Sequence, residues 1–82
     1  MNRLLIEVHV PAINKTFDVF VPEKAKIYEL TPLLTTVIEK LAEGLFISNA
    51  SVLCDGKTGK IYGSNVTLEE MRIKNGSRVM LI

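Results

Sequence analysis

Two segments near the start of the chain place apolar side chains at every second position. They are residues 3–10, RLLIEVHV, and residues 15–21, KTFDVFV. A period of two is typical of a half-buried β-strand. Residues 11–14, Pro-Ala-Ile-Asn, separate the segments and carry turn-forming residues. The pattern therefore predicts a β-hairpin over residues 3–21, closed by Pro22.

The apolar period then lengthens to about 3.6 residues, which is typical of one amphipathic helix. Its apolar positions are Ile27, Leu30, Leu34, Val37, Ile38 and Leu41. Pro32 lies inside this stripe, and proline is tolerated best in the first turn of a helix. We therefore expect the regular helix to begin between Glu29 and Thr31, or to kink there. Gly44 is expected to end it in the left-handed conformation.

The second half of the chain contains shorter patterns, which predict short strands and turns. Residues 45–50 are expected to form a loop anchored by Phe46, followed by short strands at 51–54 and 60–62 around a turn-rich link. Thr67-Leu68-Glu69-Glu70 fits a capping box and predicts one helical turn ending near Arg72. Asn75-Gly76 then leads into a last strand over 77–82, with Gly76 at a positive φ.

These elements predict a single α+β domain over residues 1–82, with one sheet covered by one main helix. The core should combine the inward strand positions with the helix stripe. The predicted core residues are Leu4, Ile6, Val8, Phe17, Val19, Ile27, Leu30, Leu34, Ile38, Leu41, Val52, Ile61, Leu68, Val79 and Leu81.

Composition narrows the classes of function. The 82 residues are 48% hydrophobic and carry a net charge of +1, which favours neither a nucleic acid nor an acidic membrane surface. The N-terminal apolar run is broken by Glu7 and His9, so it predicts neither a signal peptide nor a membrane span. We expect a cytoplasmic protein without direct membrane insertion.

The sequence offers few groups for chemistry. One cysteine, Cys54, and one histidine, His9, give no spacing suited to a metal or a catalytic pair. Cys54 is expected to be a small buried residue, and His9 a solvated strand-end residue open to a pH-sensitive contact. DGKTGK at 55–60 lacks phosphate-loop spacing and is expected to be a turn. We expect no enzyme, no cofactor, no metal and no small-molecule substrate.

Several segments resemble the ubiquitin-like β-grasp superfamily in order and spacing. They are KTFDVFV at 15–21, AKIYEL at 25–30 and TLEEMRIKNGSRVMLI at 67–82. Within it, VPAINKTFDVFVP and SVLCDGKTGKIY are most similar to the stand-alone YukD-like proteins, encoded at type VII secretion loci of Gram-positive bacteria. The resemblance implies a mixed sheet of strand order 2-1-5-3-4 packed on the main helix.

Ubiquitin and the sulfur carriers of this fold end in a flexible tail that closes on Gly-Gly. This sequence ends at Ile82 on an apolar strand pattern, as the YukD-like proteins do. A modifier or sulfur carrier is therefore the disfavoured alternative. The favoured function is a non-conjugating protein–protein interaction module, an accessory or regulatory protein of type VII secretion whose partner is a component of the secretion apparatus.

Strand alternation suggests where such a partner docks. If Val79 and Leu81 face the helix, Met80 and Ile82 face away. If Val52 and Cys54 point inward, Leu53 points outward in the same way. Leu5 is on the outer face of the first strand. The predicted protein-binding patch on the open face of the sheet is Leu5, Leu53, Met80 and Ile82, with Glu7, Arg78 and Phe20 at its border. The alternative is that these are ordinary exposed apolar residues.

Overall fold

The hairpin predicted at the start of the chain is confirmed. In the computed structural model, which describes residues 3–43 and 52–82, β1 (Arg3–Val10) pairs antiparallel with β2 (Lys15–Pro22) along their whole length. A single 3₁₀ turn, η1 (Pro11–Ile13), and Asn14 at φ 50° connect the strands. Asparagine tolerates this left-handed conformation, so the sequence of the turn fits its geometry.

The main helix α1 (Ile27–Leu41) begins earlier than expected. The prediction that it starts between Glu29 and Thr31 is wrong, because a distant segment satisfies the first N–H groups of the helix. The Ile27 amide donates to the Val66 carbonyl, and the Tyr28 amide to the Ser64 carbonyl, each at 2.9 Å. Helix ends need such partners, and here tertiary structure supplies them.

Pro32 therefore lies inside α1 instead of in its first turn. It is exposed, and its ring nitrogen removes one donor from the helical ladder. Three threonine hydroxyls near it donate to the carbonyls four residues earlier: Thr31 to Ile27, Thr35 to Thr31, and Thr36 to Pro32, at 2.9–3.1 Å. These bonds run along the helix on both sides of the proline.

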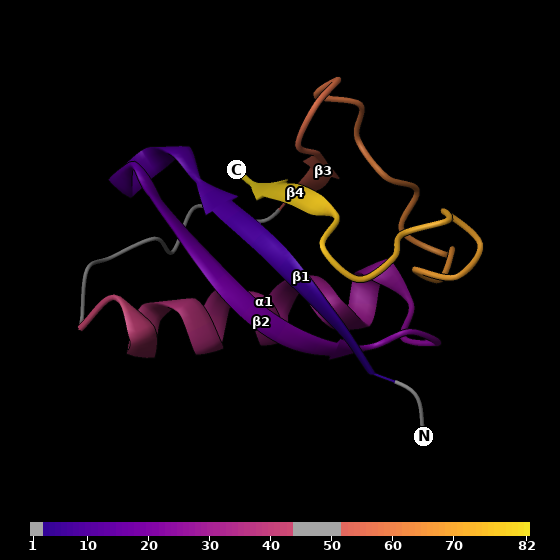
Figure 1. The fold of residues 1–82 in the computed structure, drawn as a ribbon, viewed down its shortest axis with the longest axis horizontal. Coiled ribbons are helices and arrows are strands. Elements are labelled where there is room, and N and C mark those ends of the chain that lie inside the picture. Colours follow the sequence, from indigo (N-terminus) through magenta and orange to yellow (C-terminus); the bar gives the residue numbers. More distant parts are fainter. Residues whose placement is uncertain (1–2, 44–51) are drawn as a thin grey trace.

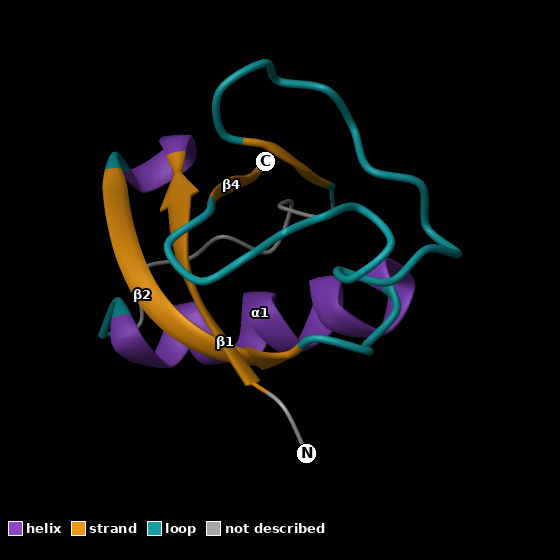
Figure 2. Ribbon diagram, turned by 45° about the vertical axis from the view of Figure 1, so that its right-hand side comes forward, coloured by secondary structure: helices purple, strands orange, loops and turns teal. Residues whose placement is uncertain are grey.

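The sheet has the order β2-β1-β4-β3 and lies on one face of α1 (Figures 1 and 2). β4 (Arg78–Leu81) runs parallel to β1 and antiparallel to β3 (Leu53–Asp55). This is the predicted mixed arrangement of an α+β fold. The strand expected at 60–62 is reduced to one isolated bridge between Cys54 and Ile61, so a fifth strand is not formed among the described residues.

Most of the predicted core is confirmed. Side chains from β1, α1, β3 and β4 join in one apolar cluster with Leu68 and Ile73. Leu4, Phe17 and Val19 pack against it while partly buried, and Val52 is half-buried. Two predicted core residues are wrong. Leu41 is 52% exposed and Ile61 is 63% exposed, since Leu41 is the last helical residue and Ile61 lies on the connection beyond β3.

The connection from β3 to β4 contains the predicted capping box. The Glu70 amide donates to the Thr67 hydroxyl, and the Thr67 amide to the Glu70 carboxylate, both at 3.1 Å. The residues that follow form turns and not the predicted turn of helix. Gly76 has φ +84°, as predicted. Gly44 and Phe46 lie outside the described residues.

Candidate functional site

The face of the sheet away from α1 carries the side chains that alternate with the core. On β1 these are Leu5, Glu7 and His9, which lie between the buried residues Ile6, Val8 and Val10. Register places Phe20 of β2 opposite Leu5, and Arg78 and Met80 of β4 beside Glu7 and His9. Leu5 is 37% exposed and Ile82 is 46% exposed. We call this surface the outer face.

The prediction that Leu53 belongs to this surface is wrong. Leu53 is 2% exposed and is part of the core. It lies directly opposite Leu81 on the antiparallel neighbour β4, and directly opposite residues share one face of a sheet. Because Leu81 points toward α1, Leu53 does so too. Cys54 is instead opposite Met80, so the prediction that it points inward is also wrong, although the residue is buried, as expected.

The three remaining patch residues are not contiguous. Glu7 and Arg78 lie side by side between Leu5 and Met80, and they form an ion pair at 2.7 Å. The Met80 row, at His9, lies four positions along β1 from the Leu5 row, which corresponds to roughly 13 Å. Glu7 and Arg78 thus divide the outer face instead of bordering it. Leu5 is grouped with Phe20, whose ring lies 5.2 Å from the Arg3 guanidinium.

His9 and Cys54 flank Met80 on the outer face. His9 Nδ1 lies 2.9 Å from the Thr16 hydroxyl on β2, so the imidazole is held across the hairpin. The Cys54 thiol donates to the Met80 carbonyl at 3.7 Å. Burial, and then the charge of Asp55, raises the pKa of this thiol. A raised pKa disfavours the reactive thiolate, which agrees with a structural cysteine.

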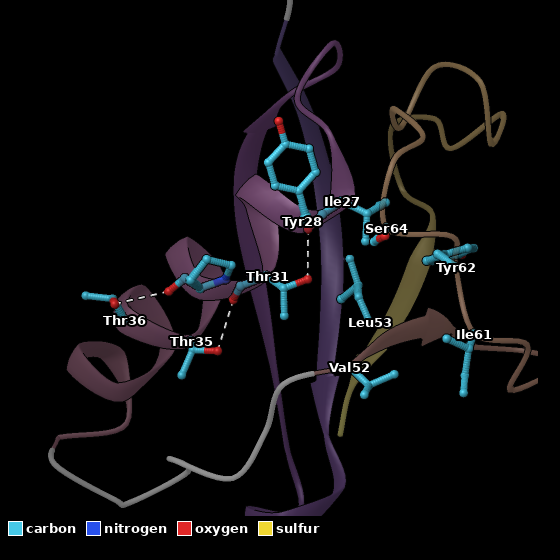
Figure 3. Close-up of a pocket in the computed structure, with 11 residues that line it drawn as sticks. Ile27, Tyr28, Thr31, Thr35, Thr36, Val52, Leu53, Ile61, Tyr62 and Ser64 are labelled. Atoms are coloured by element: carbon cyan, nitrogen blue, oxygen red, sulfur yellow. Dashed lines mark hydrogen bonds between the residues drawn. The ribbon is translucent and has the colours of Figure 1, made fainter.

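An apolar groove lies on the opposite side of the sheet, between α1 and residues 52–64, with a volume of about 660 Å³. Figure 3 shows the threonines of α1 on one side, Ile61 and Tyr62 on the other, and Leu53 between them. Because the Thr31, Thr35 and Thr36 hydroxyls donate to helix carbonyls, this wall presents mainly methyl groups. The groove suits an apolar side chain.

A second groove, which we call the basic groove, was not anticipated from the sequence. It has a volume of about 780 Å³ and lies where the turn at 55–60 meets residues 71–78. Its basic side chains are Lys57, Lys60, Arg72, Lys74 and Arg78. The sequence contains no basic run because these residues come from two separate segments, 57–60 and 72–78. The signal available in advance was the density of Lys and Arg between 57 and 78.

Within residues 3–43 and 52–82, no group of three or more His, Cys, Asp or Glu side chains is arranged to hold a metal ion. In the same part of the chain, α1 falls short of the length and apolar character that a bilayer-spanning helix needs.

The arrangement of a four-stranded mixed sheet on one helix is that of the ubiquitin-like β-grasp fold, and solved structures agree. No family model and no curated protein matches the sequence. The chain superimposes over 100% of its length on 94% of the EccD5 ubiquitin-like domain of Mycobacterium xenopi, with a TM-score of 0.84 and 20% identity.

Two further structures give the same result. The ubiquitin-like domain of the Mycobacterium tuberculosis type VII secretion system protein EccD1 matches at a TM-score of 0.81 and 13% identity, over 100% of this chain and 99% of that one. A chain of the ESX-5 inner membrane complex matches at 0.83 and 15% identity, over 100% of this chain and 21% of that one. The chain therefore has the ubiquitin-like fold.

Proposed function

We propose that residues 1–82 form one ubiquitin-like domain that acts as a non-conjugating protein-interaction module of a type VII secretion apparatus. The observation that supports this most is the superposition of the whole chain on the ubiquitin-like domain of a type VII secretion protein, at a TM-score of 0.81. The resemblance of residues 10–22 and 51–62 to YukD-like proteins supports the same assignment. In this proposal the module is a cytoplasmic accessory or regulatory protein without enzymatic activity.

The partner in this proposal is a component of the secretion apparatus. A similar domain belongs to a chain of an inner membrane complex, so contact with such a complex is the natural role for this module. The outer face is the proposed docking surface. Leu5 and Ile82 are exposed there, and Met80 lies between His9 and Cys54. A few residues near the centre of an interface tend to dominate its affinity.

Site-specific crosslinking in the native cells tests the proposal. A photo-reactive amino acid at Met80 should yield an adduct with a protein of the secretion apparatus. The same probe at Lys40, an exposed residue of α1 that lines neither groove, is the control and should yield none. An adduct at Lys40 alone, or no secretion protein in the Met80 adduct, would contradict the assignment.

The modifier or sulfur-carrier alternative makes a different prediction. It requires an acyl-adenylate when the protein is incubated with a ubiquitin-type or sulfur-carrier activating enzyme and ATP. The proposed interaction module should form none, and mass spectrometry of the reaction distinguishes the two.

A further inference from the structure

Charge is distributed unevenly over this nearly neutral chain. The basic groove holds five of the ten Lys and Arg side chains but only two of the nine carboxylates, Glu7 and Asp55. The groove therefore carries a net charge of +3, while the rest of the chain carries −2. A concave surface lined by one sign of charge concentrates the electrostatic field and attracts the opposite charge.

Both carboxylates of the groove are already engaged. Glu7 pairs with Arg78 at 2.7 Å. One Asp55 oxygen accepts from the amides of Lys57 and Thr58, at 2.7 and 3.3 Å. Among the described residues, the other four cations of the groove form no ion pair, and all four are exposed. Their charge is available to a ligand.

Hydrogen bonds anchor the chain segments that carry these cations. The Gly56 amide donates to the Arg78 carbonyl at 3.0 Å, which fixes the turn carrying Lys57 and Lys60 against β4. On the other wall, the Lys74 amide donates to the Ser77 hydroxyl at 2.9 Å. The apolar residues that line the groove are Tyr62, Met71 and Ile73. The cations thus stand on anchored segments around a partly apolar lining.

We propose that the basic groove binds an extended segment of a partner protein in which acidic residues are interspersed with apolar ones. This inference rests on the proposed function in taking the ligand to be a protein. Carboxylates would pair with the lysines, and apolar side chains would contact Met71, which is half-buried at the groove. Tyr62 is the one aromatic residue among the described residues of the groove, and it is buried. Single-stranded nucleic acids need exposed aromatic platforms, so a peptide fits better.

Fluorescence anisotropy of a labelled peptide of alternating Glu and Leu tests this inference with the purified chain. Lys57→Glu/Lys60→Glu should weaken binding at least tenfold. Lys15→Glu/Lys24→Glu is the matched control. It changes the net charge by the same amount at exposed positions outside the groove and should change the affinity less than twofold. Binding should also weaken as NaCl is raised, because salt screens exposed charges. Circular dichroism must show both variants folded.

Several results would overturn the inference. They are an absence of peptide binding, equal weakening by both double variants, and binding that survives replacement of Glu by Gln in the peptide. Tighter groove-dependent binding to phosphatidylglycerol vesicles or to a single-stranded DNA oligomer would also overturn it. The proposed function is tested separately by the Met80 crosslink. If that crosslink forms in native cells while the peptide does not bind, the inference fails and the proposed function stands.

Discussion

The backbone amide of Leu5 donates to the side-chain oxygen of Asn75 at 2.8 Å, although 70 positions separate them in the sequence. The Leu5 carbonyl accepts in return from the Gly76 amide, also at 2.8 Å. The Glu7 amide also donates to the Ser77 carbonyl at 2.9 Å. These contacts extend the pairing of β1 to residues 75–77, which precede β4. The turn at Asn75 thereby helps to fix where β4 begins beside β1.

Asn75→Ala should lower the free energy of unfolding by about 0.5–1.5 kcal/mol, the usual net contribution of one hydrogen bond. Asn75→Asp keeps an acceptor oxygen and is the matched control, with a smaller loss. Urea denaturation measures both, and hydrogen exchange of the Leu5 amide should be faster in the Ala variant alone. An unchanged exchange rate would show that this bond does not protect the amide.

Gly76→Val should destabilise the domain by about 1–2 kcal/mol, because Gly76 has φ +84° and a side chain with a branched β-carbon resists this conformation. A β-carbon at Gly76 would meet no atom within 4 Å, so the cost is conformational and not steric. Gly63→Ala is the control. Its β-carbon would make only ordinary contacts at 3.9 Å with Val66, and its denaturation midpoint should stay near that of the parent.

Leu53→Ala should cost about 2–5 kcal/mol, since it removes a buried side chain and leaves a cavity. Ile61→Ala, at a position that is 63% exposed, should cost less than about 1 kcal/mol. Thermal or chemical denaturation of the two variants decides between the observed core and the one predicted from the sequence. Equal losses would mean that Ile61 contributes to the core after all.

Tyr62 should make the stability depend on pH in the alkaline range. Burial, then the charges of Asp55 and Cys54, raises the pKa of Tyr62 from 10.0 to about 12. The unfolded chain loses the phenolic proton first as the pH rises. The contribution of Tyr62 is therefore complete below pH 10 and is lost between pH 10 and about 12.

Tyr62→Phe should reduce this alkaline loss of stability, whereas Tyr28→Phe, at an exposed position on α1, should leave it in place. Denaturation midpoints at a series of pH values measure the difference, and ultraviolet titration follows the phenol directly. Identical pH profiles for the Tyr62 variant and the parent would contradict the raised pKa.

Local patterns determined the elements that are long and strongly periodic. Residues 3–10 and 15–21 alternate over whole strands. The hairpin, and the side chains that each strand turns toward the core, could therefore be predicted without tertiary information. The same holds for the capping box at Thr67 and for the positive φ of Gly76. In each of these cases the deciding interaction is made between near neighbours in the chain.

Tertiary structure decided what these patterns leave open. Residues 52–54, Val-Leu-Cys, are all apolar, so alternation could not choose a face, and the pairing of Leu53 with Leu81 made the choice. α1 begins at Ile27 because carbonyls of residues 64 and 66 accept its first amides. The basic groove exists because the fold brings together five cations from two separate segments, 57–60 and 72–78. Such contacts join residues far apart in sequence, so a local pattern of apolar and polar residues cannot predict them.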